Sequence, residues 1–198
     1  MKRIAILLTA LALVATGCNK GQKFTLTGNL EAAGFSVGTD SILVQSDAFP
    51  QLFSIPVQDG QFSYSGKVEK PAAATLKGVG GAMVTQMVVL EKGDIVFQDG
   101  LPTGTPLNDA SSAFISSLRA FVKEHSSDRE AVYQEAEKRL GDYLKEHGND
   151  PSAVLVLMVT RRFVRPEALA ELLQKTSPEV QNDSHVHRIK NQLKTQLK

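Results

Sequence analysis

Apolar and polar residues alternate along the chain from residue 24 to about residue 98, and turn residues interrupt the alternation at short intervals. Phe24 and Leu26 are separated by Thr25, for example. A period of two directs one face of a strand into a core and the other into solvent, so this half predicts an antiparallel sheet. Further strands are expected at residues 42–44, 52–57, 62–68, 74–76, 84–90 and 95–97.

The connections between these strands carry recognisable turn residues. Residues 58–61 (Gln-Asp-Gly-Gln) and 91–94 (Glu-Lys-Gly-Asp) each predict a hairpin turn, because glycine takes the positive φ that a tight connection requires. Residues 77–82 (Lys-Gly-Val-Gly-Gly-Ala) lack the Lys-Ser/Thr pair of a phosphate-binding loop and predict a flexible inter-strand loop. About seven short strands over one core predict a β-sandwich or an open barrel for residues 24–107.

The period changes at residue 108, where apolar residues begin to recur every three to four positions. Asp109 is placed to cap a first helix. Ser127 and Glu130 have the spacing of a capping box for a second helix, which would run to Gly148. These two helices would bury Ala113, Phe114, Leu118, Phe121 and Val122, and then Val132, Tyr133, Ala136, Leu140, Tyr143 and Leu144.

Three more helices are expected before the C-terminus. Asp150 and Pro151 predict a cap and a first-turn proline for a helix through about Arg162, although the apolar run 154–159 alone also fits a buried strand. Pro166 and Pro178 open the other two. The last helix would bury one stripe of side chains, comprising Val186, Ile189, Leu193 and Leu197. The predicted fold class is therefore α+β, with an antiparallel β-sandwich-like N-terminal domain and an all-helical region over residues 108–198.

The first residues have the features of an export signal. Lys2 and Arg3 precede an apolar run over residues 4–14, which is shorter than the roughly 20 residues of a membrane-spanning helix. Small residues and then Cys18 follow, and this pattern resembles the lipobox of bacterial lipoproteins, with Ala15 where leucine is commoner. The resemblance implies a signal peptide over residues 1–17, an acylated Cys18 and a lipidated tether over 18–23. The alternative is a secreted soluble protein with an incidental cysteine.

The residues after Cys18 bear on localisation. The segment 19–23 (Asn-Lys-Gly-Gln-Lys) contains no acidic residue. By resemblance to lipoproteins of double-membrane bacteria, this implies sorting to the outer membrane, with the protein facing the periplasm. Two or more acyl chains would anchor such a protein stably, whereas one chain binds only marginally.

Composition removes several function classes. The chain has 22 Lys+Arg and 21 Asp+Glu, a formal charge of +1, which offers no electrostatic footprint for a nucleic acid. One cysteine among 198 residues forms neither an internal disulfide nor a Cys-x-x-Cys pair nor a multi-thiolate zinc site.

Several segments together resemble a known family. Residues 59–66 (Asp-Gly-Gln-Phe-Ser-Tyr-Ser-Gly) with Pro71, residues 90–95 and residues 104–109 are similar to the domain of unknown function 4369 (DUF4369). This all-β domain precedes the thioredoxin domain of envelope disulfide reductases, and the start of the third predicted helix at residues 149–152 resembles the linker between the two. The family's Trp-Cys-x-x-Cys motif is missing from these 198 residues, so the resemblance implies a body without redox catalysis.

Candidate chemical residues are dispersed. His185 and His187, with Asp183 nearby, are weak metal candidates, since side chains two apart on a helix diverge and a solvated helix surface explains them. Acidic residues at expected turns and caps also have structural roles, namely Glu91, Asp94, Asp99 and Asp109. The last helix also carries a basic stripe opposite its apolar stripe and could lie on an anionic membrane, but packing of the apolar stripe on the helical layer is favoured. The basic stripe comprises Arg188, Lys190, Lys194 and Lys198.

These observations favour a lipid-anchored binding or scaffold module over an enzyme. A separate thioredoxin-like reductase in the periplasm is one expected protein partner, and no cofactor is expected beyond the covalent lipid on Cys18. The alternatives are a hydrolase-type enzyme and a small-ligand-binding protein, each with its site at the junction of sheet and helices.

Overall fold

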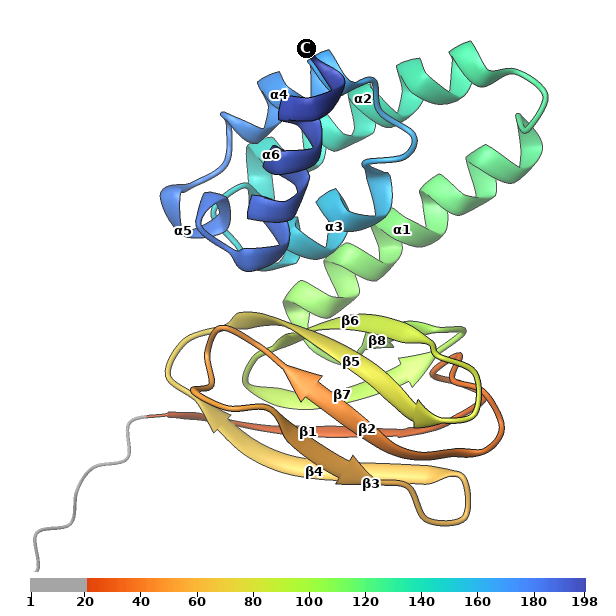
Figure 1. Ribbon diagram of the computed structural model, residues 1–198, viewed down its shortest axis with the longest axis vertical. Helices are drawn as coiled ribbons and strands as arrows, with labels where there is room; N and C mark the ends of the chain where they lie inside the picture. Colours follow the sequence, from red (N-terminus) through yellow and green to blue (C-terminus); the bar gives the residue numbers. More distant parts are fainter. Residues whose placement is uncertain (1–20) are drawn as a thin grey trace, which may run out of the picture.

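The computed structural model describes residues 21–198, so the predicted signal peptide and Cys18 lie outside the described residues. Strands form a two-layered sandwich in the first half of the described chain, and helices stack on one side of it (Figure 1). The architecture is α+β, as the sequence predicts.

Eight strands form the sandwich within residues 21–198. They are β1 (Gln22–Asn29), β2 (Thr39–Gln45), β3 (Phe53–Pro56), β4 (Gln61–Val68), β5 (Ala72–Gly80), β6 (Thr85–Leu90), β7 (Gly93–Gln98) and β8 (Leu101–Thr103). Sheet A has the order β4-β1-β7-β8, and sheet B has the order β3-β2-β5-β6. Neighbouring strands are antiparallel except β1 and β7, a parallel pair that the alternation of residues does not indicate.

The inward faces of the two sheets enclose an apolar core. Alternate residues of β1, Phe24 and Leu26, are almost fully buried, as the period of two predicts. Phe62 lies at the centre, with its ring edge-on to Phe35 at 6.2 Å and to Phe97 at 6.1 Å between centroids. Edge-to-face contacts of this kind stabilise the core beyond the contribution of the apolar area that they bury.

One of the two predicted hairpin turns forms and the other does not. Asp59 and Gly60 have φ values of 51° and 72° and close a tight turn in which Gln58 and Gln61 exchange backbone hydrogen bonds as an antiparallel bridge, although β3 and β4 on either side belong to different sheets. Residues 91–94 likewise cross from sheet B to sheet A. The reason is that consecutive strands place their apolar faces on opposite sides of one core. The residues of the turn alone do not show which sheet the next strand joins.

Two further details of the sandwich differ from the sequence prediction. The first part of the glycine-rich segment, residues 77–80, continues β5 instead of forming a loop. A short strand after Asp99 and Gly100, β8, is missed because it contains Pro102, a residue that argues against a strand assignment. Proline is tolerated there because β8 is an edge strand of sheet A.

Six helices follow within the described residues. They are α1 (Pro106–Glu124), α2 (Arg129–His147), α3 (Ser152–Thr160), α4 (Pro166–Leu173), α5 (Pro178–Gln181) and α6 (Ser184–Gln196). The stripe assigned to one final helix belongs to α6, because α5 ends after a single turn. Val186, Ile189 and Leu193 are buried against the helical layer, as favoured, whereas Leu197 is 45% exposed.

The helix starts differ from prediction at three positions. The residue before α1 is Thr105, not Asp109, whose carboxylate instead accepts the Gly104 N–H. Asp128, not Ser127, caps α2 by accepting the Ala131 N–H at 3.0 Å. Proline 151 precedes α3 itself, so the helix begins one residue later.

The helical layer shares its apolar core with the outer face of sheet B. Helices α1 and α3 lie above β5 and β6 (Figure 1), and Ala73 and Val89 from these strands belong to the same buried cluster as the helices. Helix α3 is buried on nearly all sides, and its sequence accordingly has no polar face. Without a polar face the sequence does not show the helical period, so it fits a buried strand equally well.

Two buried polar residues fix α1 to sheet B. The Asn108 side chain accepts the Val89 N–H at 2.9 Å and donates to the Val89 carbonyl at 2.7 Å. It thereby satisfies backbone groups on β6, an edge strand of sheet B. Glu91 accepts the N–H groups of Leu107 and Asn108 at 2.8 and 3.1 Å, so its carboxylate caps the N-terminus of α1.

Candidate functional site

A chain of three polar side chains connects sheet B to α6 at the junction with the helices. The Thr75 hydroxyl lies 2.6 Å from Nε2 of His185, and Nδ1 of His185 lies 3.0 Å from the Asp183 carboxylate. Thr75 is in the middle of β5, while the other two residues lie at the start of α6. The sequence interpretation of His185 as solvated helix surface is wrong, because this side chain is only 5% exposed.

Asp183 has two roles in this arrangement. Its side chain caps α6 by accepting the His185 N–H at 2.7 Å, and it also contacts the His185 ring. Burial raises the pKa of Asp183, but hydrogen bonds from the His185 ring and from the N–H groups of His185 and Val186 outweigh burial and hold the pKa below its ordinary value. The carboxylate is therefore negative at neutral pH and orients the ring.

The order hydroxyl, imidazole, carboxylate is also the order of a nucleophilic catalytic triad. Here Thr75 is enclosed by neighbouring strands, because β5 pairs with β2 on one side and β6 on the other. Neither of the two grooves described below is lined by Thr75, His185 or Asp183. The geometry suits a hydrogen-bonded connection between β5 and α6 more than a site that a substrate enters.

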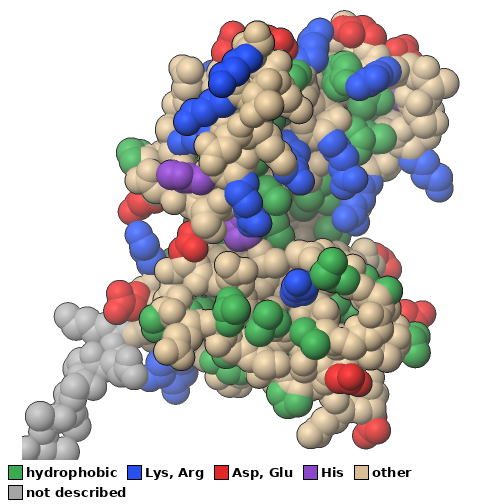
Figure 2. All heavy atoms as spheres, viewed as in Figure 1, with side chains coloured by type: hydrophobic (Ala, Val, Ile, Leu, Met, Phe, Trp, Pro, Cys, Tyr) green, Lys and Arg blue, Asp and Glu red, His purple; other side chains and the backbone are tan. Residues whose placement is uncertain are grey.

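Other polar contacts also join the sandwich to the helical region near this point. The Ser184 N–H donates to the Asp47 carboxylate at 3.1 Å, and Lys70 pairs with Glu179 at 3.1 Å across the exposed rim of the junction. Figure 2 shows a narrow waist between the sandwich and the helices on this face, with hydrophobic side chains visible inside it. The junction is thus an apolar contact edged by polar bonds.

The two weak metal candidates, His185 and His187, do not converge. Both ring nitrogens of His185 are engaged by Thr75 and Asp183, and His187 is exposed on another side of α6. No group of three or more His, Cys, Asp or Glu side chains suitable for a metal occurs among residues 21–198.

The acidic residues at the predicted turns and caps, Glu91, Asp94, Asp99 and Asp109, have structural positions. Glu91 and Asp109 hold the start of α1, as described above. Asp94 accepts a hydrogen bond from the Thr25 hydroxyl at 2.5 Å, and Asp99 takes a positive φ of 51° in the turn before β8. These contacts account for the positions of the four residues in turns and at the start of a helix.

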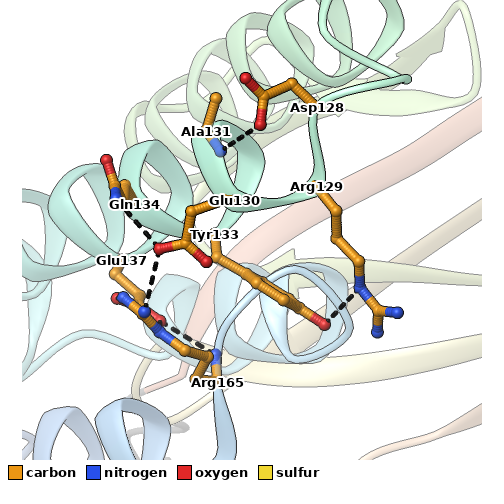
Figure 3. Close-up of polar contacts among 8 residues, drawn as sticks. All are labelled: Asp128, Arg129, Glu130, Ala131, Tyr133, Gln134, Glu137 and Arg165. Carbon is orange, nitrogen blue, oxygen red and sulfur yellow. Dashed lines mark hydrogen bonds and ion pairs between the residues drawn. The ribbon is translucent and has the colours of Figure 1, made fainter.

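A charged network lies farther along the helical region, between α2 and the start of α4 (Figure 3). Arg165 binds Glu137 through Nε at 2.7 Å and through a second guanidinium nitrogen, and it also contacts Glu130 at 3.2 Å. The hydrogen bond from Arg165 is the main reason that the pKa of Glu137 is lowered, although burial opposes it. These charges satisfy one another, so the network ties two helices together.

A groove of the helical region lies between α3, α4 and α6. It has a volume of about 790 Å³ and an apolar floor that includes Met158 and Ile189. Arg161 and Arg162 lie on its rim, where Arg161 donates to the Gln192 side chain at 2.8 Å. This groove is open to solvent and lies away from the sheet, so it does not match the ligand site considered at the junction.

Sequence reasoning missed an exposed apolar loop tip at one end of the sandwich. Val37 in the loop between β1 and β2 is 96% exposed, Met83 in the turn between β5 and β6 is 74% exposed, and Val79 at the end of β5 is 46% exposed. We call these three residues the loop tip. Val37 precedes Gly38, and Val79 lies between Gly78 and Gly80; apolar residues beside glycines were the signal that could have found this surface.

The two loops of the tip are held together by specific contacts. The Ser36 hydroxyl donates to the Ala82 carbonyl at 2.9 Å. Gly81 has φ +53°, and a Cβ atom there would lie 2.6 Å from Ser36 Oγ and 3.0 Å from the Val37 carbonyl oxygen. A side chain at Gly81 would therefore force the loops apart, which explains the glycine.

Membrane contact by a spanning helix finds no support in the described residues: no helix within 21–198 has the length and apolar character needed to cross a bilayer. Comparisons with protein-family models, with curated proteins and with solved structures found no match to this chain.

Proposed function

We propose that this chain is a lipid-anchored cell-envelope protein that acts as a non-catalytic binding module. In this proposal Cys18 carries the lipid, and the loop tip contacts a protein partner in the periplasm. A separate thioredoxin-like reductase is the partner class that the resemblance to DUF4369 suggests. The outer membrane, with the body facing the periplasm, is the location that the residues after Cys18 favour.

One geometric observation carries the proposal: the anchor end and the loop tip are at opposite ends of the sandwich. The described chain enters at the start of β1, where Gln22 pairs with Val68. The loop tip follows the other end of β1, beside the turn at Gly100, whose Cα atom lies 3.6 Å from the position of a Cβ on Gly34. Eight residues of extended strand separate the two ends by about 25 Å.

This separation favours a protein, not the anchoring bilayer, as the occupant of the tip. A lipid on Cys18 holds the first end of the sandwich near the membrane, so the tip is directed away from the surface. The Asp40 carboxylate also lies beside the tip, 2.7 Å from where a Cβ on Gly80 would be. A carboxylate next to the apolar side chains disfavours an anionic lipid surface.

The junction alternatives receive less support. The Thr75–His185–Asp183 chain has the order of catalytic groups, but its hydroxyl lies within a paired strand and its imidazole is buried. The space between sheet and helices is occupied by apolar side chains of the shared core. A binding surface at an exposed loop is accessible to a partner without any opening of this junction.

The anchor is tested by the intact mass of protein extracted from membranes. An acylated chain beginning at Cys18 is the expected species. A soluble form with a free thiol would contradict the anchor while leaving the loop tip to be tested separately.

The partner surface is tested by substitution of the loop tip. Val37→Ser with Met83→Ser should reduce recovery of a co-purifying envelope protein about tenfold, since loss of exposed apolar anchors weakens an interface strongly. Leu52→Ser, an exposed apolar residue (54%) after the opposite end of β2, is the matched control. Support requires that the captured protein, once purified, binds the native chain and not the tip variant. Equal capture by both variants, or transfer of the tip into lipid, would refute this surface.

A further inference from the structure

A second surface of the sandwich lies at the anchor end, where a shallow groove opens on sheet A. The groove has a volume of about 510 Å³. Three of the residues that line it are lysines, which come from three different segments: Lys23 in β1, Lys67 in β4 and Lys92 in the connection before β7. We call Lys23, Lys67 and Lys92 the lysine groove.

Two of these lysines are direct neighbours across the sheet. Lys23 of β1 and Lys67 of β4 are register partners, and both side chains are exposed on the outer face of sheet A. Like charges in directly opposed positions destabilise a pair of strands. Folding alone therefore gives no reason for this pair, whereas a bound anion would relieve the repulsion.

The acidic groups near the lysine groove do not neutralise it. Within residues 21–198 none of the three lysines takes part in an ion pair. Asp94 is the acidic residue that lines the groove, and it accepts a hydrogen bond from Thr25. Glu69 follows the end of β4 but is not among the lining residues. The groove thus keeps an excess of positive charge.

The lysine groove is also next to the point where the described chain begins. A Cβ atom on Gly21 would lie 3.0 Å from Cβ and 3.7 Å from Cδ of Lys67, so the Lys67 side chain runs alongside the start of β1. Figure 2 shows a basic side chain at the place where the described chain begins. Four residues from Cys18 to Gln22 span at most about 14 Å.

We propose that the lysine groove binds the phosphate groups of anionic phospholipids in the membrane that carries the anchor, and so orients the sandwich on that membrane. This inference rests on the proposed function, because a lipid on Cys18 would hold the groove within reach of the headgroups. Charges act over about 8 Å at physiological ionic strength, so lysines at the anchor end feel the membrane surface and those on distant helices do not. Each lysine near an anionic surface strengthens binding about fivefold, which corresponds to about 1 kcal/mol.

A fluorescent reporter can test this because the chain contains no tryptophan. Ser65→Trp places one indole at the groove, and Met83→Trp places one at the loop tip as a positional control. Protein purified from membranes is mixed with vesicles containing a headgroup-labelled quencher, made of phosphatidylcholine alone or with about 30 mol% phosphatidylglycerol. Intact mass records separately whether Cys18 is acylated.

The charge requirement is tested by two triple variants that remove equal charge. Lys23→Gln, Lys67→Gln and Lys92→Gln together remove the groove lysines. Lys123→Gln, Lys138→Gln and Lys175→Gln, all at exposed positions of the helical region, are the matched control. Circular dichroism and thermal unfolding confirm that both variants fold.

The proposal expects stronger quenching of the Ser65→Trp reporter on phosphatidylglycerol vesicles than on neutral ones, and weaker quenching in about 0.5 M salt. For chains that carry no acyl group, the groove variant should bind these vesicles about a hundredfold more weakly, while the control variant binds like the native chain.

Equal quenching on both kinds of vesicle, or equal loss in both triple variants, would overturn the proposal. So would competition by millimolar inorganic phosphate, which would identify a free-phosphate site instead. Because charge dependence is read with or without acylation, failure of the anchor and failure of the groove remain distinguishable.

Discussion

The sandwich and the helical region differ in the contacts that accompany their apolar cores. The sandwich core contains a cluster of aromatic rings, in which Phe62 contacts Phe35 and Phe97. The helical core is mostly aliphatic and is surrounded by pairs of acidic and basic side chains. Of the seven such pairs in residues 21–198, six lie wholly within the helical region and one, Lys70 with Glu179, joins the two parts.

The two regions also differ in how some charged side chains are used. In the helical region Arg165 is engaged by Glu137 and Glu130. In the sandwich, by contrast, the lysine groove keeps its charge and the loop tip keeps its apolar side chains exposed. The stability of the helical region should consequently depend on pH, and the surfaces proposed for binding are on the sandwich.

The largest expected effect comes from breaking the connection between the two regions. Asn108→Ala leaves the Val89 N–H and carbonyl buried without their side-chain partner. Loss of hydrogen bonds to a fully buried residue should lower the free energy of unfolding by about 2–3 kcal/mol. Urea unfolding measures this change, and hydrogen exchange should show protection falling first in α1 and β6.

The exposed Asn182 provides a control for that substitution. Asn182→Ala should change the free energy of unfolding by less than about 0.5 kcal/mol. If Asn108→Ala were equally mild, the connection between the helices and sheet B would rest on apolar contact alone.

Much of this architecture could be predicted from local patterns, because each pattern reflects one buried face. The alternation around Phe24 and Leu26 located the first strand, and Pro166 located the start of α4. The connection at residues 91–94 was mispredicted as a hairpin, since the sheet that a strand joins depends on contacts far away in sequence. The start of α1 was also misplaced, because the carboxylate that accepts its first N–H groups is that of Glu91, in the connection between β6 and β7.

The candidate surfaces were harder to predict for the same physical reason. His185 looks solvated by its spacing from His187, and only the position of Thr75 on a distant strand shows why it is buried. Lys23 and Lys67 are 44 positions apart and become neighbours through strand register. Cys18 differs from these residues, since its assignment depends on neighbouring residues alone and stays a prediction.

Acid should weaken the helical region before the sandwich. The pKa values of Glu137 and Asp183 are lowered by folding from ordinary values of 4.5 and 3.8. A lowered carboxylate pKa gives stability that is present above the unfolded pKa and is lost as the pH falls through the folded pKa. Hydrogen exchange in α2, α4 and α6 should therefore increase below about pH 4.5, while β1 and β5 stay protected.

Glu137→Gln separates this ionic contribution from general acid unfolding. At neutral pH the variant should lose about 1–2 kcal/mol, because the bonds from Arg165 are no longer made to a charged group and the site is partly solvated. Its stability should also fall less steeply with acid than that of the native chain. Glu146→Gln, at an exposed position of the same helix, should retain the native pH dependence. Simultaneous loss of protection in both regions would contradict the comparison.

The smallest expected effect has the opposite sign and concerns the lysine groove. Lys67→Gln removes one of two like charges in directly opposed positions on β1 and β4, so it should raise the free energy of unfolding by a few tenths of a kcal/mol in the absence of lipid. The gain should shrink in high salt, because salt already screens the repulsion between exposed lysines. Lys138→Gln on α2 should give no gain: the pKa of the nearby Asp142 is lowered mainly by the hydrogen bond from Lys145, and the charge of Lys138 also contributes. Parallel urea titrations of the two variants at low and high salt measure the difference, and a loss of stability in Lys67→Gln would mean that Lys67 serves the fold instead of an anionic ligand.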